Sequence, residues 1–144
     1  MLDIGAGLGA LTAPLVDRGA RVVAIELHPR RAQALRDRFG HAVTVVQTDA
    51  RDLRLPRRPY SVVANPPFTV TAALLRRVLQ PGSRLVAAHL VLQDQAARRW
   101  SSPGAPAHPR WSRTFVATTA FAVPRRAFRP PPQVDGRVLM IRRR

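Results

Sequence analysis

The segment that organises this sequence reads Asp3-Ile4-Gly5-Ala6-Gly7-Leu8-Gly9-Ala10. It follows a short apolar run, Met1–Ile4, which predicts the end of a buried strand, and it leads into a helical pattern over Leu8–Arg18. Glycines at such a turn permit positive φ angles and let a ligand approach the backbone. The start of the helix adds free N–H groups and a partial positive charge. The turn therefore predicts a site for a carboxylate, a phosphate or a ribose.

The spacing of the glycines leaves the ligand open. Gly5, Gly7 and Ala10 also fit the dinucleotide fingerprint, with Glu26 about 20 residues further on to bind a ribose. Alone, the turn fits NAD and S-adenosylmethionine equally, and a tight turn without any ligand is a third interpretation. Asp3 and the third glycine, Gly9, favour S-adenosylmethionine. The carboxylate of Asp3 can anchor the turn or bind the amino group of a zwitterionic ligand, whereas it repels a pyrophosphate.

Outward from this turn, short apolar runs alternate with helical patterns. The predicted strands are Met1–Ile4, Arg21–Ile25, Val43–Thr48, Tyr60–Ala64 and Leu85–Leu92, and the predicted helices are Leu8–Arg18, Pro29–Phe39, Thr71–Leu79 and Asp94–Trp100. This alternation predicts an α/β fold with a mostly parallel sheet and helices on both of its faces.

The last third of the chain has a different character. Ser101–Arg113 is rich in Ser, Pro and Arg and predicts a mobile loop. Thr114–Val123 and Arg137–Arg142 are strand-like, with a Pro-rich connection and no helix between them. They predict an antiparallel strand pair at the C-terminal edge of the sheet. No internal repeat or second domain is evident.

Composition excludes several classes of protein. The 144 residues, 46% of them hydrophobic, suffice for one globular domain. There is no run of about 18 apolar residues for a membrane helix, and the first residues do not resemble a signal peptide. Cysteine is absent, which excludes disulfides and Cys-ligated metals, and the four histidines lack ligand spacing. We expect a cytoplasmic protein without a metal.

The net charge of +16 is the strongest global feature, and every basic side chain is arginine. A GC-rich genome would explain the absence of lysine, but it would not explain the excess of basic over acidic residues. From Gln95 to Arg144 the chain has eleven arginines and one acid, Asp135. Arginine pairs well with phosphates and stacks on bases. Because no long amphipathic helix carries the charge, nucleic acid is a better partner than a membrane.

Two acids follow successive predicted strands. Glu26 ends the second strand and can accept hydrogen bonds from a ribose diol. Asp49 ends the third and can accept one from an adenine amino group, while the N–H of Ala50 binds a ring nitrogen. A solvated or helix-capping acid is the alternative for either residue alone. Their joint position behind a glycine turn favours ligand binding.

The fourth predicted strand ends in Asn65-Pro66-Pro67-Phe68. Two prolines fix the backbone and lack N–H groups, so the side-chain oxygen of Asn65 and the carbonyl of Pro66 can both face a substrate. An exocyclic amine needs such acceptors, since its lone pair is delocalised into the ring. Phe68 can stack on a base that has left its helix. The alternative is a rigid Pro-Pro turn with a core phenylalanine.

Together these residues resemble the rRNA adenine N6-methyltransferase family, which contains ribosome-maturation dimethyltransferases and macrolide-resistance (Erm) methyltransferases. The resemblance covers essentially the whole chain. The matching segments are Asp3–Gly9 (first cofactor motif), Glu26 (ribose acid), Asp49-Ala50 (adenine contact), Asn65–Phe68 (the catalytic Asn-x-Pro-Phe/Tyr loop), Leu90–Gln93 (fifth strand), and Val123–Pro130 with Val134-Asp135 (late signature).

The resemblance implies a Rossmann-like class I methyltransferase that transfers methyl from S-adenosylmethionine to the N6 amino group of an adenine in rRNA. The implied site residues are catalytic Asn65, Pro66 and Phe68; cofactor-binding Asp3, Gly5, Gly7, Glu26, Asp49, Ala50 and Asn65; and base-stacking Phe68 and Phe128. On sequence alone, Phe128 fits a hairpin core position equally well.

Phe68, where many maturation enzymes carry Tyr, and the Arg-rich tail favour the resistance branch and large-subunit rRNA. We expect a single catalytic domain over residues 1–144, without the N-terminal segment and C-terminal helical domain usual in the family, acting as a monomer. The alternatives are a small-subunit rRNA dimethyltransferase, a DNA adenine methyltransferase, or a truncated RNA-binding module without activity. An NAD-dependent oxidoreductase is the most distant, because it has no use for Asn65.

Overall fold

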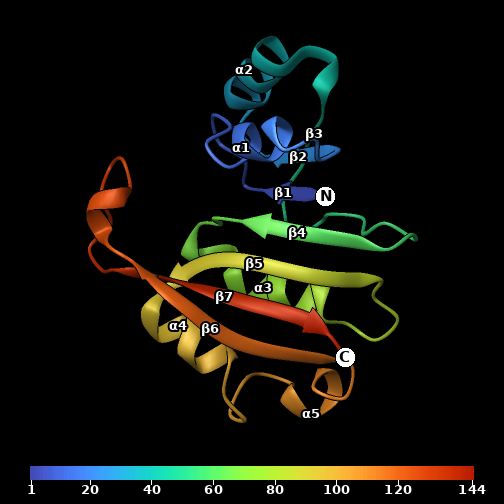
Figure 1. Ribbon diagram of the computed structural model, residues 1–144, viewed down its shortest axis with the longest axis vertical. Helices are drawn as coiled ribbons and strands as arrows, with labels where there is room; N and C mark the ends of the chain where they lie inside the picture. The colour runs from blue at the N-terminus through green and yellow to red at the C-terminus, as the bar shows by residue number, and fades with distance from the viewer.

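Seven strands form one sheet in the computed structural model, which describes residues 1–144 (Figure 1). The strands are β1 (Leu2–Ile4), β2 (Val22–Glu26), β3 (Val43–Gln47), β4 (Tyr60–Ala64), β5 (Leu85–Gln93), β6 (Phe115–Val123) and β7 (Gly136–Arg143). The α-helices are α1 (Thr12–Asp17), α2 (Pro29–Phe39), α3 (Phe68–Val78), α4 (Asp94–Trp100) and α5 (His108–Trp111), and two short 3₁₀ helices are η1 (Gly40–Ala42) and η2 (Arg125–Ala127).

The strand order is β3-β2-β1-β4-β5-β7-β6. All neighbouring pairs from β3 to β5 are parallel, and β7 runs antiparallel to both β5 and β6. This confirms the predicted α/β fold with an antiparallel arrangement at the C-terminal edge. The strand order reverses between β1 and β4, and ligands of open α/β sheets bind at the carboxyl ends of the strands beside such a reversal.

Apolar side chains pack on both faces of the sheet. On one face α1 and α2 cover β1–β3, where Leu35 of α2 is fully buried against Val22 and Val43. On the other face α3 packs on β5, α4 packs on β5, β7 and β6, and α5 lies beside the start of β6 (Figure 1). The strand β5 carries Leu85 and Leu90 with no exposed area. Burial of each such leucine stabilises the fold by roughly 1.5–3 kcal/mol, so β5 is a main contributor to the stability of the C-terminal half.

Two helix boundaries differ from the prediction. The first helix was expected from Leu8 but α1 begins at Thr12, because Gly7 and Gly9 adopt left-handed φ values of 59° and 88° that an α-helix cannot contain. The helix α3 was expected from Thr71 but begins at Phe68, directly after the N-cap residue Pro67. The turn after β1 is therefore longer than predicted, and Phe68 belongs to a helix.

The prediction of a mobile loop over Ser101–Arg113 was wrong. This segment contains α5, and it buries Ala105 and Trp111 to 6% and 5% exposure. The Trp111 indole donates a hydrogen bond from Nε1 to the carbonyl of Pro106 at 3.0 Å. Tertiary burial of one tryptophan outweighs a loop-like local composition, so the segment closes the core beside α4. No helix of the fold is both long and apolar enough to cross a membrane.

Candidate active site

The predicted ligand residues gather at the carboxyl edge of four adjacent strands. Ile4 pairs with Ile25 on one side and with Ala64 on the other, so the residues that follow β1 and β4 leave the sheet side by side. Gly5 has a φ of 77°, and a Cβ added to it would lie 3.6 Å from the backbone oxygen of Asn65. The glycine turn thus packs directly against the Asn65–Phe68 loop.

Glu26 holds the glycine turn from the end of β2. Its side chain is almost completely buried, and Oε2 accepts a hydrogen bond from the backbone N–H of Gly7 at 2.8 Å. Oε1 accepts a second bond from the N–H of His28 at 2.9 Å. Each carboxylate oxygen has two lone pairs, so both retain capacity for a ribose diol. Glu26, the residue predicted to bind a ribose, therefore also fixes the conformation of the glycine turn.

Asp3 lies beneath the turn with no exposed area. Its Oδ2 accepts a hydrogen bond from Thr12 Oγ1 at 2.6 Å, whereas Oδ1 has no partner. Burial raises the pKa of this carboxyl, and the nearby carboxylate of Glu26 raises it further. A buried acceptor without a donor is costly, and a cationic donor from a ligand would relieve that cost. The unpartnered acceptor Oδ1 therefore fits the donor N–H groups of a zwitterionic ligand's amino group.

Asp49, just after β3, is engaged by its neighbour Arg51. The Arg51 Nη2 lies 2.6 Å from Oδ2, and the Arg51 backbone N–H lies 2.8 Å from Oδ1. These hydrogen bonds lower the pKa of Asp49 to about 2. The N–H of Ala50 donates to no group of the chain. The adenine amino group of a cofactor would thus share the Asp49 carboxylate with Arg51, while the N–H of Ala50 is free to bind a ring nitrogen.

A pocket of about 440 Å³ adjoins the Asn65–Phe68 loop. Its lining combines that loop with β5 and the long β6–β7 connection, and the residues are Asn65, Pro66, Pro67, Phe68, Val91, Leu92, Phe128, Pro130, Pro132, Val134 and Gly136. Neither the Asn65 side chain nor the Pro66 carbonyl forms a hydrogen bond within the chain. Pro67, in contrast, accepts one from Val70 at 3.0 Å, which fixes the loop to α3.

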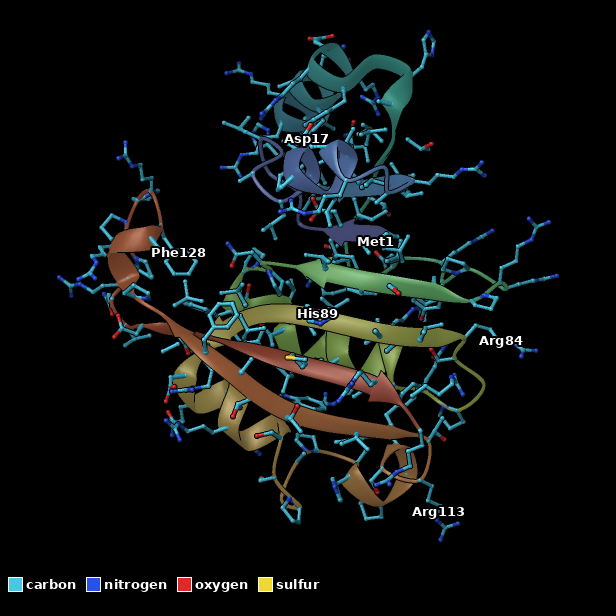
Figure 2. The ribbon with its side chains drawn as sticks, in the orientation of Figure 1. Met1, Asp17, Arg84, His89, Arg113 and Phe128 are labelled. Atoms are coloured by element: carbon cyan, nitrogen blue, oxygen red, sulfur yellow. The ribbon has the colours of Figure 1, made fainter.

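Phe128 reaches this pocket from the β6–β7 connection, at the end of the sheet opposite Arg84 (Figure 2). A Cβ on Gly136 would lie 3.3 Å from Phe128 Cζ, so the absence of a side chain there makes room for the ring. Asp135 Oδ1 accepts a hydrogen bond from the N–H of Arg125 at 2.7 Å, and its carbonyl accepts one from the N–H of Asp94. The connection is thereby tied to α4.

The structure brings Asn65, Pro66, Phe68 and Phe128 together around one pocket. Gly5, Gly7, Glu26 and Asp49 do not line it; they lie on the adjoining edge of the sheet. Two lining residues, Pro132 and Gly136, were not among the predicted site residues, although both are breakers near a strand start. No group of His, Asp or Glu side chains is arranged to hold a metal ion. Chemically, the pocket offers two free acceptors at its rim and two phenylalanine rings in its walls.

Residues 1–144 match the ribosomal RNA adenine dimethylase family. A Corynebacterium diphtheriae protein named rRNA adenine N-6-methyltransferase is 38% identical, over 99% of this chain and 57% of its own length. The mycinamicin-resistance protein MyrB of Micromonospora griseorubida is 38% identical, over 100% of this chain and 47% of its own length. Ribosomal RNA small subunit methyltransferase A of Cupriavidus taiwanensis is 33% identical, over 96% and 54%. The chain thus spans about half the length of the curated relatives it matches.

Solved structures agree with the observed fold. The 23S rRNA methyltransferase ErmE superposes with a TM-score of 0.85 at 32% identity, over 99% of this chain and 60% of that one. A dimethyladenosine transferase from Plasmodium falciparum superposes with a TM-score of 0.81 at 23% identity, over 99% and 55%.

Proposed function

The chain belongs to the ribosomal RNA adenine dimethylase family, and on that basis we propose that it transfers methyl groups from S-adenosylmethionine to the exocyclic N6 of an adenine in rRNA. One observation carries the proposal: the Asn65–Phe68 loop and Phe128, which are distant in sequence, line the same pocket. The loop also packs against the glycine turn through Gly5, so a base in the pocket would lie beside a ligand of the turn.

The chemistry expected of this loop is orientation of a poor nucleophile. The Asn65 side-chain oxygen and the Pro66 carbonyl would accept hydrogen bonds from the two amino hydrogens of adenine, favouring a pyramidal nitrogen as it attacks. Phe68 and Phe128 would hold the extruded base by stacking. No strong general base is required, because the proton can leave after positive charge has developed on the nitrogen. Positioning and preorganised acceptors provide the rate enhancement.

S-adenosylmethionine, when bound, supplies an electrophilic methyl group. The residues that would hold it are those of the adjoining edge: Asp3, Gly5, Gly7, Glu26, Asp49, Ala50 and Asn65. The unpartnered Oδ1 of buried Asp3 suits the ammonium group of a zwitterion, and the unused N–H of Ala50 suits a ring nitrogen. We propose that these contacts select this cofactor over a dinucleotide.

We further propose that residues 1–144 form a single catalytic domain and act as a monomer in the cytoplasm, where rRNA is available, because one chain carries every residue of the pocket. The similarity to MyrB and ErmE, together with Phe68, supports the resistance branch and a large-subunit adenine. The similarity to small subunit methyltransferase A keeps the small-subunit adenine as the second candidate.

The test is transfer of tritiated methyl groups from S-adenosylmethionine to transcripts of the two ribosomal RNAs. We expect incorporation into the large-subunit transcript, with primer-extension stops at one adenine. Incorporation into the small-subunit transcript instead would overturn the resistance branch. RNA binding without any incorporation would contradict the proposed methyl transfer and support an RNA-binding module without activity.

A further inference from the structure

A basic path of pockets continues from the candidate active site along the face of the sheet that carries α3 and α4. A pocket of about 380 Å³ between α3 and α4 shares Phe68 with the active-site pocket. A second pocket on this path, of about 350 Å³, shares Trp100 and Pro106 with the pocket between α3 and α4. A third pocket, also of about 350 Å³, shares Pro81 and Arg110 with the second pocket. Each of the three pockets adjoins the next in space, and together they lead away from the active site. We call the third, at the far end, the distal groove.

The charge along this path has one sign. The three pockets are lined by five arginines, Arg76, Arg84, Arg99, Arg110 and Arg143, and by no acid. From Tyr60 to the C-terminus the only acids are Asp94 and Asp135. Both are already engaged close to the active site, Asp94 by arginine side chains and Asp135 by a backbone N–H. None of the ion pairs in the structure involves an arginine of the distal groove.

The distal groove has one fixed arginine and two free ones. Arg143 donates from Nε to the carbonyl of Leu85 at 2.9 Å and from Nη2 to the carbonyl of Ser83, and its guanidinium lies 5.0 Å from the ring centre of Phe115. These contacts hold the guanidinium in place and leave its other N–H groups unused. Arg84 and Arg110 are exposed and form no hydrogen bond or ion pair through their side chains.

We propose that the distal groove binds the phosphate backbone of the RNA substrate, several nucleotides away from the target adenine. A fixed guanidinium flanked by two unpaired ones is suited to phosphate oxygens, because arginine offers paired donors to them. The distance supports separate contacts: β5, which spans the sheet between the two sites, extends over nine residues, or about 30 Å at ~3.3 Å per residue. Figure 2 places Arg84 at the end of the sheet opposite Phe128.

This inference rests on the proposed RNA substrate and adds a second contact region to it. It implies that the chain recognises an extended or folded RNA rather than a single nucleotide. It also assigns an RNA-binding role to Arg84, Arg110 and Arg143, which lie far from the candidate active site.

The experiment compares two double variants of the full chain by fluorescence anisotropy. Arg84→Ala with Arg110→Ala removes the free arginines of the distal groove. Arg31→Ala with Arg36→Ala is the matched control, since both residues are exposed and unpaired on α2, outside the groove. The probes are a fluorescent rRNA stem-loop of about 30 nucleotides and a single strand of about 7 nucleotides around the target adenine.

We expect the groove variant to bind the long RNA roughly tenfold more weakly and to lower the magnitude of its salt slope by about 1.4 to about 1.8, at ~0.7 per lost phosphate contact on a single strand and ~0.9 on a duplex. The control should lose less than about twofold, and the short strand should bind both variants equally. Equal losses in the two double variants, unchanged affinity in the groove variant, or an equal loss on the short strand would each overturn the proposal.

Thermal melting verifies that both variants fold, and Arg84→Gln with Arg110→Gln is the second groove variant, retaining more of each side chain. Methyl transfer by the unmodified chain to the same stem-loop is measured in parallel. If the unmodified chain transfers no methyl group, the proposed function is contradicted. The difference in RNA affinity between the two double variants decides separately whether the distal groove binds RNA.

Discussion

Phe68 and Phe128 line one pocket although they come from different kinds of structure. Phe68 begins α3 directly after the Pro-Pro pair, and Phe128 lies in the β6–β7 connection beside Gly136. Phe68 is 47% exposed, more than a core residue would be. Exposure of this kind fits a ring that becomes covered when a base binds.

Replacing Phe128 by Ala should lower kcat/KM for RNA methylation by about tenfold or more, because base–aromatic stacking contributes roughly 1–3 kcal/mol per base. Steady-state kinetics with a fixed RNA measures the effect. Phe121→Ala is the matched control, since Phe121 is 70% exposed on β6 and does not line the pocket. Equal losses in both variants would mean that Phe128 acts through stability rather than through the base.

Gly9 combines a left-handed backbone with close packing. Its φ is 88°, and an added Cβ would lie 2.6 Å from Cε2 of Phe39. Gly19 has a similar φ of 77° but open space around it, so Gly19→Ala isolates the backbone strain, on the order of 1 kcal/mol. Urea unfolding should show Gly9→Ala to be clearly less stable than Gly19→Ala. Equal unfolding midpoints would contradict the packing of α2 against the turn.

The site residues show how far sequence can predict a role. Gly5, Glu26 and Asn65 could be placed at one edge because parallel strands end together. The hydrogen bonds of Glu26 to Gly7 and of Asp49 to Arg51 could not, because they depend on backbone angles within each turn. A carboxylate predicted to bind a ligand thus also has partners in its own chain.

At the scale of elements, the strands were predicted best. The runs that became β2, β4 and β5 are dominated by apolar residues, interrupted within the strands only by Ser61 and His89, so these strands are evident from composition. Helix starts were harder: α1 begins late because glycine φ values are set by the turn, and α3 begins early because Pro67 caps it. The helix α5 was missed because long-range burial of Trp111 stabilises it, and local sequence does not report such burial.

The helix α4 is joined to β7 by a charged cluster that supports the β6–β7 connection. Asp94 accepts from Arg98 Nε at 2.7 Å and also from Arg137 Nε. These hydrogen bonds lower the pKa of Asp94 below its usual value of 3.8. Because the folded-state pKa is lowered, the stabilisation is present above that usual value and is lost as pH falls through the folded pKa.

Asp94→Asn should therefore be less stable than the unmodified chain at about pH 7 and about pH 5, and the difference should shrink as pH falls below about 3.8. Urea unfolding midpoints across this pH range provide the measurement. Asp17→Asn is the control, because Asp17 is exposed and unpaired on α1, and it should show no such trend. A difference that stays constant with pH would exclude the ion pairs as its cause.

At the scale of the whole molecule, charge is distributed unevenly. Of the eight acids, six lie in the first 52 residues, so the half that carries α3, α4 and the β6–β7 connection is strongly basic. Sequence alone predicted a polyanion partner from this excess. It could not predict that three pockets align the arginines into one path, since that depends on how α3, α4 and α5 are placed around these pockets.

RNA affinity should fall steeply with salt, with a slope of log K against log salt steeper than about −3, as expected for more than about four phosphate contacts at ~0.7 each. Anisotropy titrations at several salt concentrations measure the slope. A slope near zero would remove the polyanion argument and leave the excess of arginine without a binding role.

The central claim is that Asn65 orients the amino group of an adenine for methylation, and one measurement tests it most directly. Tritiated S-adenosylmethionine and rRNA are incubated with the unmodified chain and with Asn65→Ala, and the RNA is digested to nucleosides. We predict label in N6-methylated adenosine for the unmodified chain and at least about a hundredfold less for Asn65→Ala, with RNA affinity unchanged within about twofold. Equal incorporation by the two proteins, or label in any other nucleoside, would contradict the account.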